Sequence, residues 1–193
     1  MRIVSGTFKG RRIQAPKNLP VRPTTDMSKE ALFNVLNNRY HFSQLRVLDL
    51  FSGTGNISYE FASRGSQEIT AVDADFNCVK FIKATSAGFE MDLSVVKSDV
   101  YKFLEANKTV YDLIFADPPY DFSEKQFLTI VDLVFEKQSL ESEGCLIIEH
   151  SKHTKLDVHP NFVEKRAYGC LLYTSDAYEA ELTAYLCEKL QQI

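Results

Sequence analysis

The fold is decided by the stretch Val47-Leu48-Asp49-Leu50-Phe51-Ser52-Gly53-Thr54-Gly55-Asn56. Its apolar first half is typical of a buried strand, and its Gly-x-Gly turn leads into a segment with helical spacing. Glycines in such a turn let the backbone pass close to a ligand, while the first amide groups of the next helix point toward it. The stretch therefore predicts a strand, a ligand-binding loop and a helix in succession.

After this stretch, apolar runs continue to alternate with segments of helical period. We expect strands at residues 46–50, 68–72, 93–96, 113–116, 144–149, 162–167 and 170–173, and helices at 56–64, 76–87, 101–106 and 127–135. Such alternation predicts βαβ units and a mostly parallel sheet. A tight turn at residues 168–169 indicates a final antiparallel hairpin at the sheet edge. Leucine spacing within 179–190 indicates a C-terminal amphipathic helix.

The segment before the sheet differs in charge from the rest of the chain. Residues 1–46 carry nine basic and two acidic side chains, a charge of +7, whereas residues 47–193 carry −11. Glycines and prolines within 6–23 favour an irregular or short-hairpin arm, and Asp26 can cap a helix that runs to about residue 37. We therefore expect a basic arm and helix at 1–45 and a larger domain at 46–193. The arm is either a solvated extension without a role or a nucleic-acid-binding element.

The composition excludes several classes of protein. The chain has 193 residues, 45% hydrophobic and 25% charged, which predicts one or two folded domains rather than a disordered chain. It contains no apolar run of membrane-spanning length and no signal-peptide core, so we expect a cytoplasmic protein. Its four cysteines lie far apart and its histidines complete no ligand set, so we expect reduced thiols and no metal.

Carboxylates stand at the ends of the first three expected strands. Asp49, four residues before Gly53, would repel a pyrophosphate but suits the cationic amino-acid part of S-adenosylmethionine, and position 58 is serine where a dinucleotide loop has a third glycine or alanine. Asp73 lies 20 residues after Gly53, where it can accept from ribose hydroxyls of either NAD or S-adenosylmethionine. Asp99 can accept from an adenine amino group, cap the next helix, or do both.

The fourth strand is followed by Asp117-Pro118-Pro119-Tyr120. Two prolines remove amide donors and restrict the backbone, which leaves carbonyl acceptors at the strand end. Asp117 and the carbonyl of Pro118 can accept from an exocyclic amino group, and Tyr120 offers a flat face on which a base can stack. The tetrapeptide therefore predicts a site that holds a nucleobase amino group.

Together, Asp-Leu-Phe-Ser-Gly-Thr-Gly and Asp-Pro-Pro-Tyr resemble the class I amino-methyltransferases that modify nucleobases. The segments at 2–13, 22–26, 29–34 and 58–65 are similar to the bacterial 16S rRNA guanine-N2 methyltransferase family, the RsmD-like enzymes. The resemblance covers about residues 1–175. It implies a Rossmann-like fold with a seven-stranded sheet and methylation of one guanine N2 in small-subunit ribosomal RNA, free or within the assembling subunit.

Carried onto matching positions, the resemblance implies three groups of residues. The expected cofactor site comprises Asp49, Phe51, Ser52, Gly53, Gly55, Asp73, Ala74, Asp99 and Val100. The expected catalytic residues are Asp117, Pro118, Pro119 and Tyr120. The expected RNA contacts are Lys9, Arg11, Arg12, Arg22, Thr24 and Lys29. We expect a monomer with no membrane partner.

Three other functions remain open from the residues. An adenine-N6 methyltransferase acting on DNA or RNA would use the same tetrapeptide. An NAD-dependent oxidoreductase would need neither Asp49 nor the proline pair. A non-catalytic RNA-binding assembly factor would share every feature except turnover.

Overall fold

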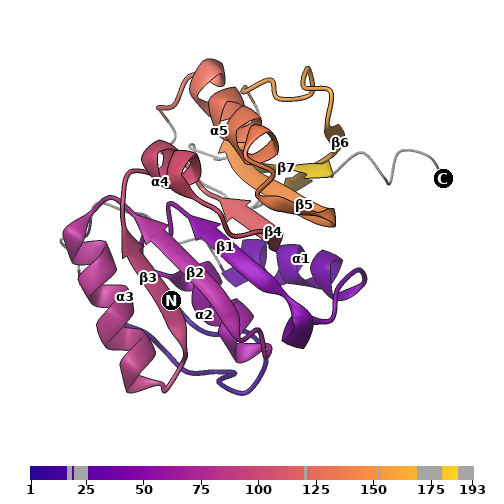
Figure 1. The fold of residues 1–193 in the computed structure, drawn as a ribbon. Coiled ribbons are helices and arrows are strands. Elements are labelled where there is room, and N and C mark those ends of the chain that lie inside the picture. The colour runs from indigo at the N-terminus through magenta and orange to yellow at the C-terminus, as the bar shows by residue number, and fades with distance from the viewer. Residues whose placement is uncertain (17–18, 20–25, 120, 152, 169–179, 187–193) are drawn as a thin grey trace, which may run out of the picture. The chain divides into compact units, whose positions relative to one another are not determined.

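The structure is a computed structural model that describes residues 1–16, 19, 26–119, 121–151, 153–168 and 180–186 (Figure 1). The chain divides into two compact units, Met1–Phe103 and Leu104–Ile193. The first unit is built on three parallel strands in the order β3, β2, β1. Their bounds are Arg46–Leu50 for β1, Glu68–Asp73 for β2 and Leu93–Lys97 for β3. Because the strands are parallel, their carboxyl ends lie at one edge.

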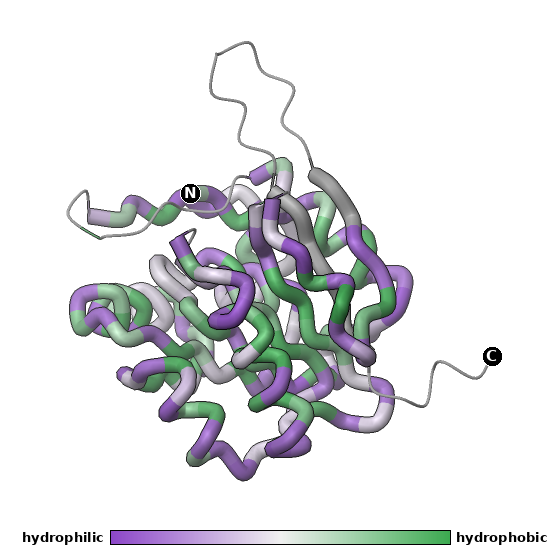
Figure 2. Tube along the Cα trace, turned by 90° about the horizontal axis from the view of Figure 1, so that it is seen from above, coloured by the Kyte–Doolittle hydropathy of each residue, from purple (hydrophilic) through white to green (hydrophobic). Residues whose placement is uncertain are grey.

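Helices cover the strands of the first unit. Helix α2 (Asn56–Ser63) packs against β1 and β2, and α3 (Phe76–Gly88) packs against β2 and β3 (Figure 1). Residues 47–50 of β1 are all buried, as expected for a parallel strand that is covered on both faces. Figure 2 shows hydrophobic and hydrophilic stretches alternating along the chain.

A second layer of aromatic side chains joins α1 (Asp26–Asn37) to α2. Phe33 of α1 and Phe61 of α2 meet edge to face with ring centroids 4.7 Å apart, and Phe42 of the short helix η1 (Phe42–Gln44) contacts both rings. Such edge-to-face pairs stabilise a core beyond the area that they bury. Helix α1 is therefore part of the first unit's core.

Residues 1–13 form a short antiparallel hairpin, which we call the N-terminal hairpin. Arg2 and Arg12 form its bridge, the amide of Ile3 donates to the carbonyl of Arg11, and the amide of Ile13 donates to that of Met1. Ile3 and Ile13 are buried in a cluster with side chains of α2 and α3. The expected arm is thus a hairpin whose apolar face belongs to the core.

A buried carboxylate in α2 fastens this hairpin. Glu60 is fully buried and accepts hydrogen bonds from the amides of Val4 and Ser5, both at 2.9 Å. The same carboxylate pairs with Arg64 at 3.0 Å and with Lys29 at 3.8 Å. A buried charge is tolerated when its hydrogen bonds and counter-charges are supplied by the fold, as they are here.

Lys29 of α1 extends the network. Its buried ammonium donates to the carbonyl of Arg2 and to Oδ1 of Asn56, the latter at 2.9 Å, and lies 3.6 Å from Asp26. Burial lowers the pKa of Lys29, and the neighbouring carboxylates of Glu60 and Asp26 oppose that shift. The hairpin, α1 and the first residue of α2 are therefore joined through one side chain.

The second unit combines parallel and antiparallel pairing. Its elements are β4 (Tyr111–Ala116), α5 (Glu124–Glu136), β5 (Leu140–Ser151), β6 (Phe162–Tyr168) and β7 (Ala180–Leu186). Strands β4 and β5 are parallel, whereas β7 pairs antiparallel with both β5 and β6. The division between the units falls within α4 (Val100–Ala106).

Most of the expected elements are confirmed. The strands expected at 46–50, 68–72, 93–96, 113–116, 144–149 and 162–167 correspond to β1–β6, and the four expected helices after residue 55 correspond to α2–α5. The parallel pairs confirm the α/β class. The strand expected at 170–173 lies outside the described residues.

The expected C-terminal helix at 179–190 is wrong, because residues 180–186 form β7. The segment Ala-Glu-Leu-Thr-Ala-Tyr-Leu alternates apolar and polar side chains at its start, which suits a strand, and both edges of β7 find backbone partners. The observed division at residues 103 and 104 also differs from the expected boundary at 45 and 46, since the N-terminal hairpin packs into the first unit. Within the described part of the chain, no helix has both the length and the apolar character needed to cross a bilayer.

Two glycines of the hairpin allow a test of its docking. Gly6 and Gly10 have φ of 81° and 83°, but a Cβ at Gly6 would lie 1.8 Å from the carbonyl oxygen of Ser63, whereas nothing lies within 4 Å of one at Gly10. We expect Gly10→Ala to lower the free energy of unfolding by about 1 kcal/mol, from left-handed strain alone. Gly6→Ala should lower it by about 3 kcal/mol or more, since backbone must move. Urea unfolding measures both, and equal losses would contradict the docked hairpin.

Candidate active site

The loop between β1 and α2 has an unusual backbone. Phe51, Gly53 and Gly55 have positive φ angles of 58°, 53° and 77°. A non-glycine residue in the left-handed region costs about 1–3 kcal/mol and is concentrated at ligand-binding loops. Phe51 in this conformation therefore marks the loop as a candidate site, as the sequence predicts.

Gly55 has no room for a side chain. A Cβ there would lie 2.8 Å from Cζ of Tyr59 and 3.0 Å from Cγ1 of Ile82. Gly55 is the N-cap of α2 and has no side chain to accept from the first amides of the helix. The positive end of the helix dipole therefore lies at the loop without a side-chain cap. The loop and helix end together suit a ligand that approaches the backbone closely.

Asp49 lies beneath this loop and is 2% exposed. Its Oδ2 accepts from the amide of Ser58 at 3.1 Å and from the hydroxyl of the same residue at 2.5 Å. Burial raises the pKa of Asp49 to about 7, and the charge of Asp73 adds to the shift. Ser58, which stands where a dinucleotide loop has glycine or alanine, is therefore the partner that orients Asp49, a role the sequence analysis missed.

Asp73 at the end of β2 joins two loops. Its Oδ2 accepts from the amide of Gly53 at 2.7 Å, and its Oδ1 accepts from the amide of Asp75 at 2.8 Å. Burial raises the pKa of Asp73. An ionised carboxylate has about four acceptor positions, so these two bonds leave capacity for further donors such as hydroxyls.

The third strand end contributes a cap and an exposed aromatic neighbour. Asp99 accepts from the amide of Lys102 at 3.1 Å, so it caps α4, and Val100 is buried. Phe76, at the start of α3 and 59% exposed, lies under the ammonium of Lys97 at 5.6 Å from its ring centroid. An exposed ring beside Ala74 and Asp73 is a further candidate contact for a base, which the sequence analysis missed because phenylalanine at a helix start reads as core.

The Asp-Pro-Pro segment belongs to the second unit and follows β4 directly. Asp117 is half-buried, Pro118 is buried and Pro119 is exposed. The carbonyl of Pro119 accepts from the amide of Phe122 at 3.1 Å, and Phe122 packs edge to face on Phe127 of α5. Phe122 therefore connects the Asp-Pro-Pro segment to α5. Tyr120 lies outside the described residues.

The expected RNA contacts fall into three groups. Lys9, Arg11 and Arg12 are exposed on the N-terminal hairpin. Arg22 and Thr24 lie outside the described residues. Lys29 is buried and occupied by the network around Glu60, so we assign it a structural role instead of a phosphate contact. Among the described residues, no group of three or more His, Cys, Asp or Glu side chains could hold a metal ion.

Comparison with known proteins adds to this geometry. A family model described as "Conserved hypothetical protein 95" matches residues 1–173. The chain is 35% identical over 161 residues to a Bacillus subtilis protein described as "Putative rRNA methyltransferase YlbH", covering 81% of this chain and 85% of that protein. It is 29% identical over 164 residues to "Ribosomal RNA small subunit methyltransferase D" of Escherichia coli K12, covering 83% and 79%.

A solved structure gives the same picture. The structure described as "Putative methyltransferase yhhF from Escherichia coli" superposes with a TM-score of 0.79 at 26% identity, covering 97% of this chain and 99% of that one. The similarity thus extends over both units of the chain.

The pKa of Asp49 predicts a pH dependence of stability. Because its folded pKa, about 7, lies above its ordinary value near 3.8, folding favours the protonated carboxyl. This contribution to stability is fully present below pH 4 and is lost as the pH rises toward 7. We therefore expect the unfolding free energy of the natural protein, relative to Asp49→Asn, to fall by up to about 1.4 kcal/mol per pH unit across that window. Urea unfolding of both proteins from pH 4.5 to pH 7.5 measures it, and a constant or rising difference would contradict the buried carboxyl.

Proposed function

The chain belongs to the family described as conserved hypothetical protein 95, the RsmD-like class I methyltransferases, and we propose that it methylates the exocyclic N2 of one guanine in 16S ribosomal RNA. The single observation that carries the reaction class is the segment of half-buried Asp117 and buried Pro118, which follows β4 directly. The RNA substrate is supported by the relatives described as ribosomal RNA methyltransferases. From the family we also infer a single seven-stranded sheet that ends in an antiparallel hairpin.

The donor set of the first unit fits S-adenosylmethionine. The carboxyl of Asp49 suits a cationic group, whose charge favours the ionised form of this buried side chain. The carboxylate of Asp73 accepts two hydrogen bonds of the roughly four that it can accept, which leaves positions for ribose hydroxyls. With these we assign Phe51, Ser52, Gly53, Gly55, Ala74, Asp99 and Val100 to the cofactor site. The chemistry that S-adenosylmethionine supplies when bound is an electrophilic methyl group on a sulfonium with a good leaving group.

The second unit supplies the residues that we assign to hold the nucleophile, the exocyclic amino nitrogen of guanine. The guanine amino nitrogen is weakly nucleophilic, because its lone pair is delocalised into the ring. Hydrogen bonds from its two protons to Asp117 and to the carbonyl of Pro118 favour a more pyramidal nitrogen. Asp117 then accepts the proton that the nitrogen loses as the new N–C bond forms. Positioning of this kind supplies roughly 7–11 kcal/mol in well-aligned reactions, so no strong base is needed.

The base must leave its stack to reach this turn, and Tyr120 is the residue that we assign to stack on it, beside the rigid Pro119. Exposed Lys9, Arg11 and Arg12 of the N-terminal hairpin, with Arg22 and Thr24, are assigned to the phosphate backbone. With ribosomal RNA or the assembling small subunit as partner, the protein acts in the cytoplasm. A monomeric state stays a prediction.

Asp117 provides the direct test of this reaction. We expect Asp117→Ala to reduce methyl transfer to 16S rRNA by at least about 100-fold, because the amino group loses its acceptor. Binding of S-adenosylmethionine, measured by calorimetry, should survive, since the assigned cofactor residues belong to the first unit. Transfer is measured with tritiated methyl donor and 16S rRNA from cells that lack this protein.

The matched control is Asp121→Ala, which removes an exposed carboxylate four residues further along and should retain near-normal transfer. Near-normal transfer by Asp117→Ala would remove this residue from the catalytic set. Loss of cofactor binding in Asp117→Ala would contradict the division of roles between the two sites.

A further inference from the structure

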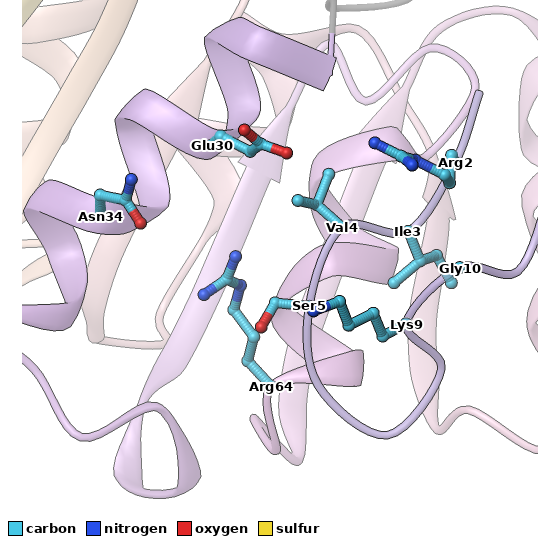
Figure 3. A pocket seen from close by; sticks show the side chains of 9 residues that line it. All are labelled: Arg2, Ile3, Val4, Ser5, Lys9, Gly10, Glu30, Asn34 and Arg64. Carbon is cyan, nitrogen blue, oxygen red and sulfur yellow. The ribbon is translucent and has the colours of Figure 1, made fainter.

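A pocket of about 430 Å³ lies between the N-terminal hairpin, α1 and the end of α2 (Figure 3). Its volume falls within the range of roughly 300–1,000 Å³ that is typical of pockets for small ligands. Three cations and one carboxylate line it, Arg2, Lys9 and Arg64 against Glu30. None of the residues that we assign to the cofactor lines it, so it is a separate site on the first unit.

Two of the cations are held in position. The guanidinium of Arg64 pairs with Glu60 at 3.0 Å and lies 4.5 Å over the ring of Phe33. Nε of Arg2 lies 3.3 Å from Asp26. Lys9, on the hairpin, is exposed. Fixed cations on a rigid wall suit an anionic group, because little side-chain entropy is lost on binding.

The opposite wall is a polar face of α1. Glu30 and Asn34 are exposed and one helical turn apart, and both line the pocket. Figure 3 shows the carboxylate of Glu30 and the guanidinium groups of Arg2 and Arg64 directed toward the same space. An ionised carboxylate only accepts hydrogen bonds and repels phosphate, so the pocket matches a ligand that presents both an anion and N–H donors.

We propose that this pocket binds one unstacked nucleotide of the RNA substrate, outside the methylation site. The phosphates on its two sides contact Arg2 and Lys9, whose charged ends Figure 3 shows at opposite sides of the pocket, and the exocyclic amino group of its base donates to Glu30. The proposal rests on the proposed function for the identity of the RNA. A carboxylate that accepts from a base amino group discriminates cytosine from uracil, whose ring carries a carbonyl at that position.

The pocket is also connected to the cofactor loop. Lys29 donates to the carbonyl of Arg2, in the pocket wall, and to Oδ1 of Asn56, the residue that follows Gly55.

The test measures, by fluorescence anisotropy, how tightly the protein binds fluorescent twelve-nucleotide oligocytidine and oligouridine. The natural protein should bind oligocytidine at least about fivefold more tightly, as one base-edge hydrogen bond predicts. Glu30→Ala should weaken oligocytidine binding by about the same factor and abolish the preference, although it removes a charge that repels RNA. Glu105→Ala, which removes an exposed glutamate from α4, is the matched control and should keep the preference.

Lys9→Gln should weaken binding of both oligonucleotides alike and lower the salt slope by about 0.7, the loss of one single-strand phosphate contact. Its control, Lys80→Gln on the exposed face of α3, should change neither. Tighter binding of both oligonucleotides by Glu30→Ala, or unchanged binding by Lys9→Gln, would contradict the proposal that the pocket binds a nucleotide.

Methyl transfer to 16S rRNA by the same preparation separates the two proposals. Transfer by the natural protein together with unchanged binding by both variants would reject the pocket and retain the methyltransferase. No transfer together with the expected cytosine preference would retain the pocket and reject the methyltransferase.

Discussion

The buried carboxylate of Glu60 is the constraint on which the first unit depends. It lies between the ammonium of Lys29 and the guanidinium of Arg64. It also accepts hydrogen bonds from the backbone amides of Val4 and Ser5. Breaking a buried ion pair by removing one partner costs about 3–5 kcal/mol, because the remaining charge stays buried without its partner. The N-terminal hairpin is therefore held by a network that is stable only when all of its members are in place.

Helix α2 is the element through which this constraint reaches the candidate site. Its first residue, Asn56, accepts from Lys29, its third, Ser58, orients the carboxyl of Asp49, and its fifth is Glu60. All of these side chains are buried although the helix has only eight residues. Polar groups that are fully satisfied in a core specify one arrangement of the elements around them. The arrangement that α2 specifies puts a strained loop before it and a basic hairpin beside it.

The sequence was most informative where one segment carries its own signal. The alternation of apolar runs predicted β1–β6, and it placed the Gly-x-Gly segment after β1 and the Asp-Pro-Pro segment after β4, as the structure has them. The segment at 180–186 was misjudged because leucines four apart suit a helix as well as a strand, and the two strands that pair with β7 decide between them. Long-range pairing was the missing information.

Charge counting failed at Lys29 for a related reason. The surplus of basic residues at the N-terminus predicted phosphate contacts, yet Lys29 is buried against Asp26 of its own helix and against Asn56 and Glu60 of α2. Two other roles also depend on residues distant in the sequence. Ser58 orients the carboxyl of Asp49. Arg64 lines the pocket together with Glu30. A sequence shows how many charges a segment carries, and only the fold shows which of them face outward.

Methylation of a guanine amino group in small-subunit ribosomal RNA is tested most directly by nucleoside mass spectrometry. The 16S rRNA comes from cells that lack the protein and is measured before and after incubation with the purified protein and S-adenosylmethionine. We expect N2-methylguanosine to appear at one mapped position only after incubation. Methylated adenosine, or no new nucleoside in either free RNA or small subunits, would contradict it.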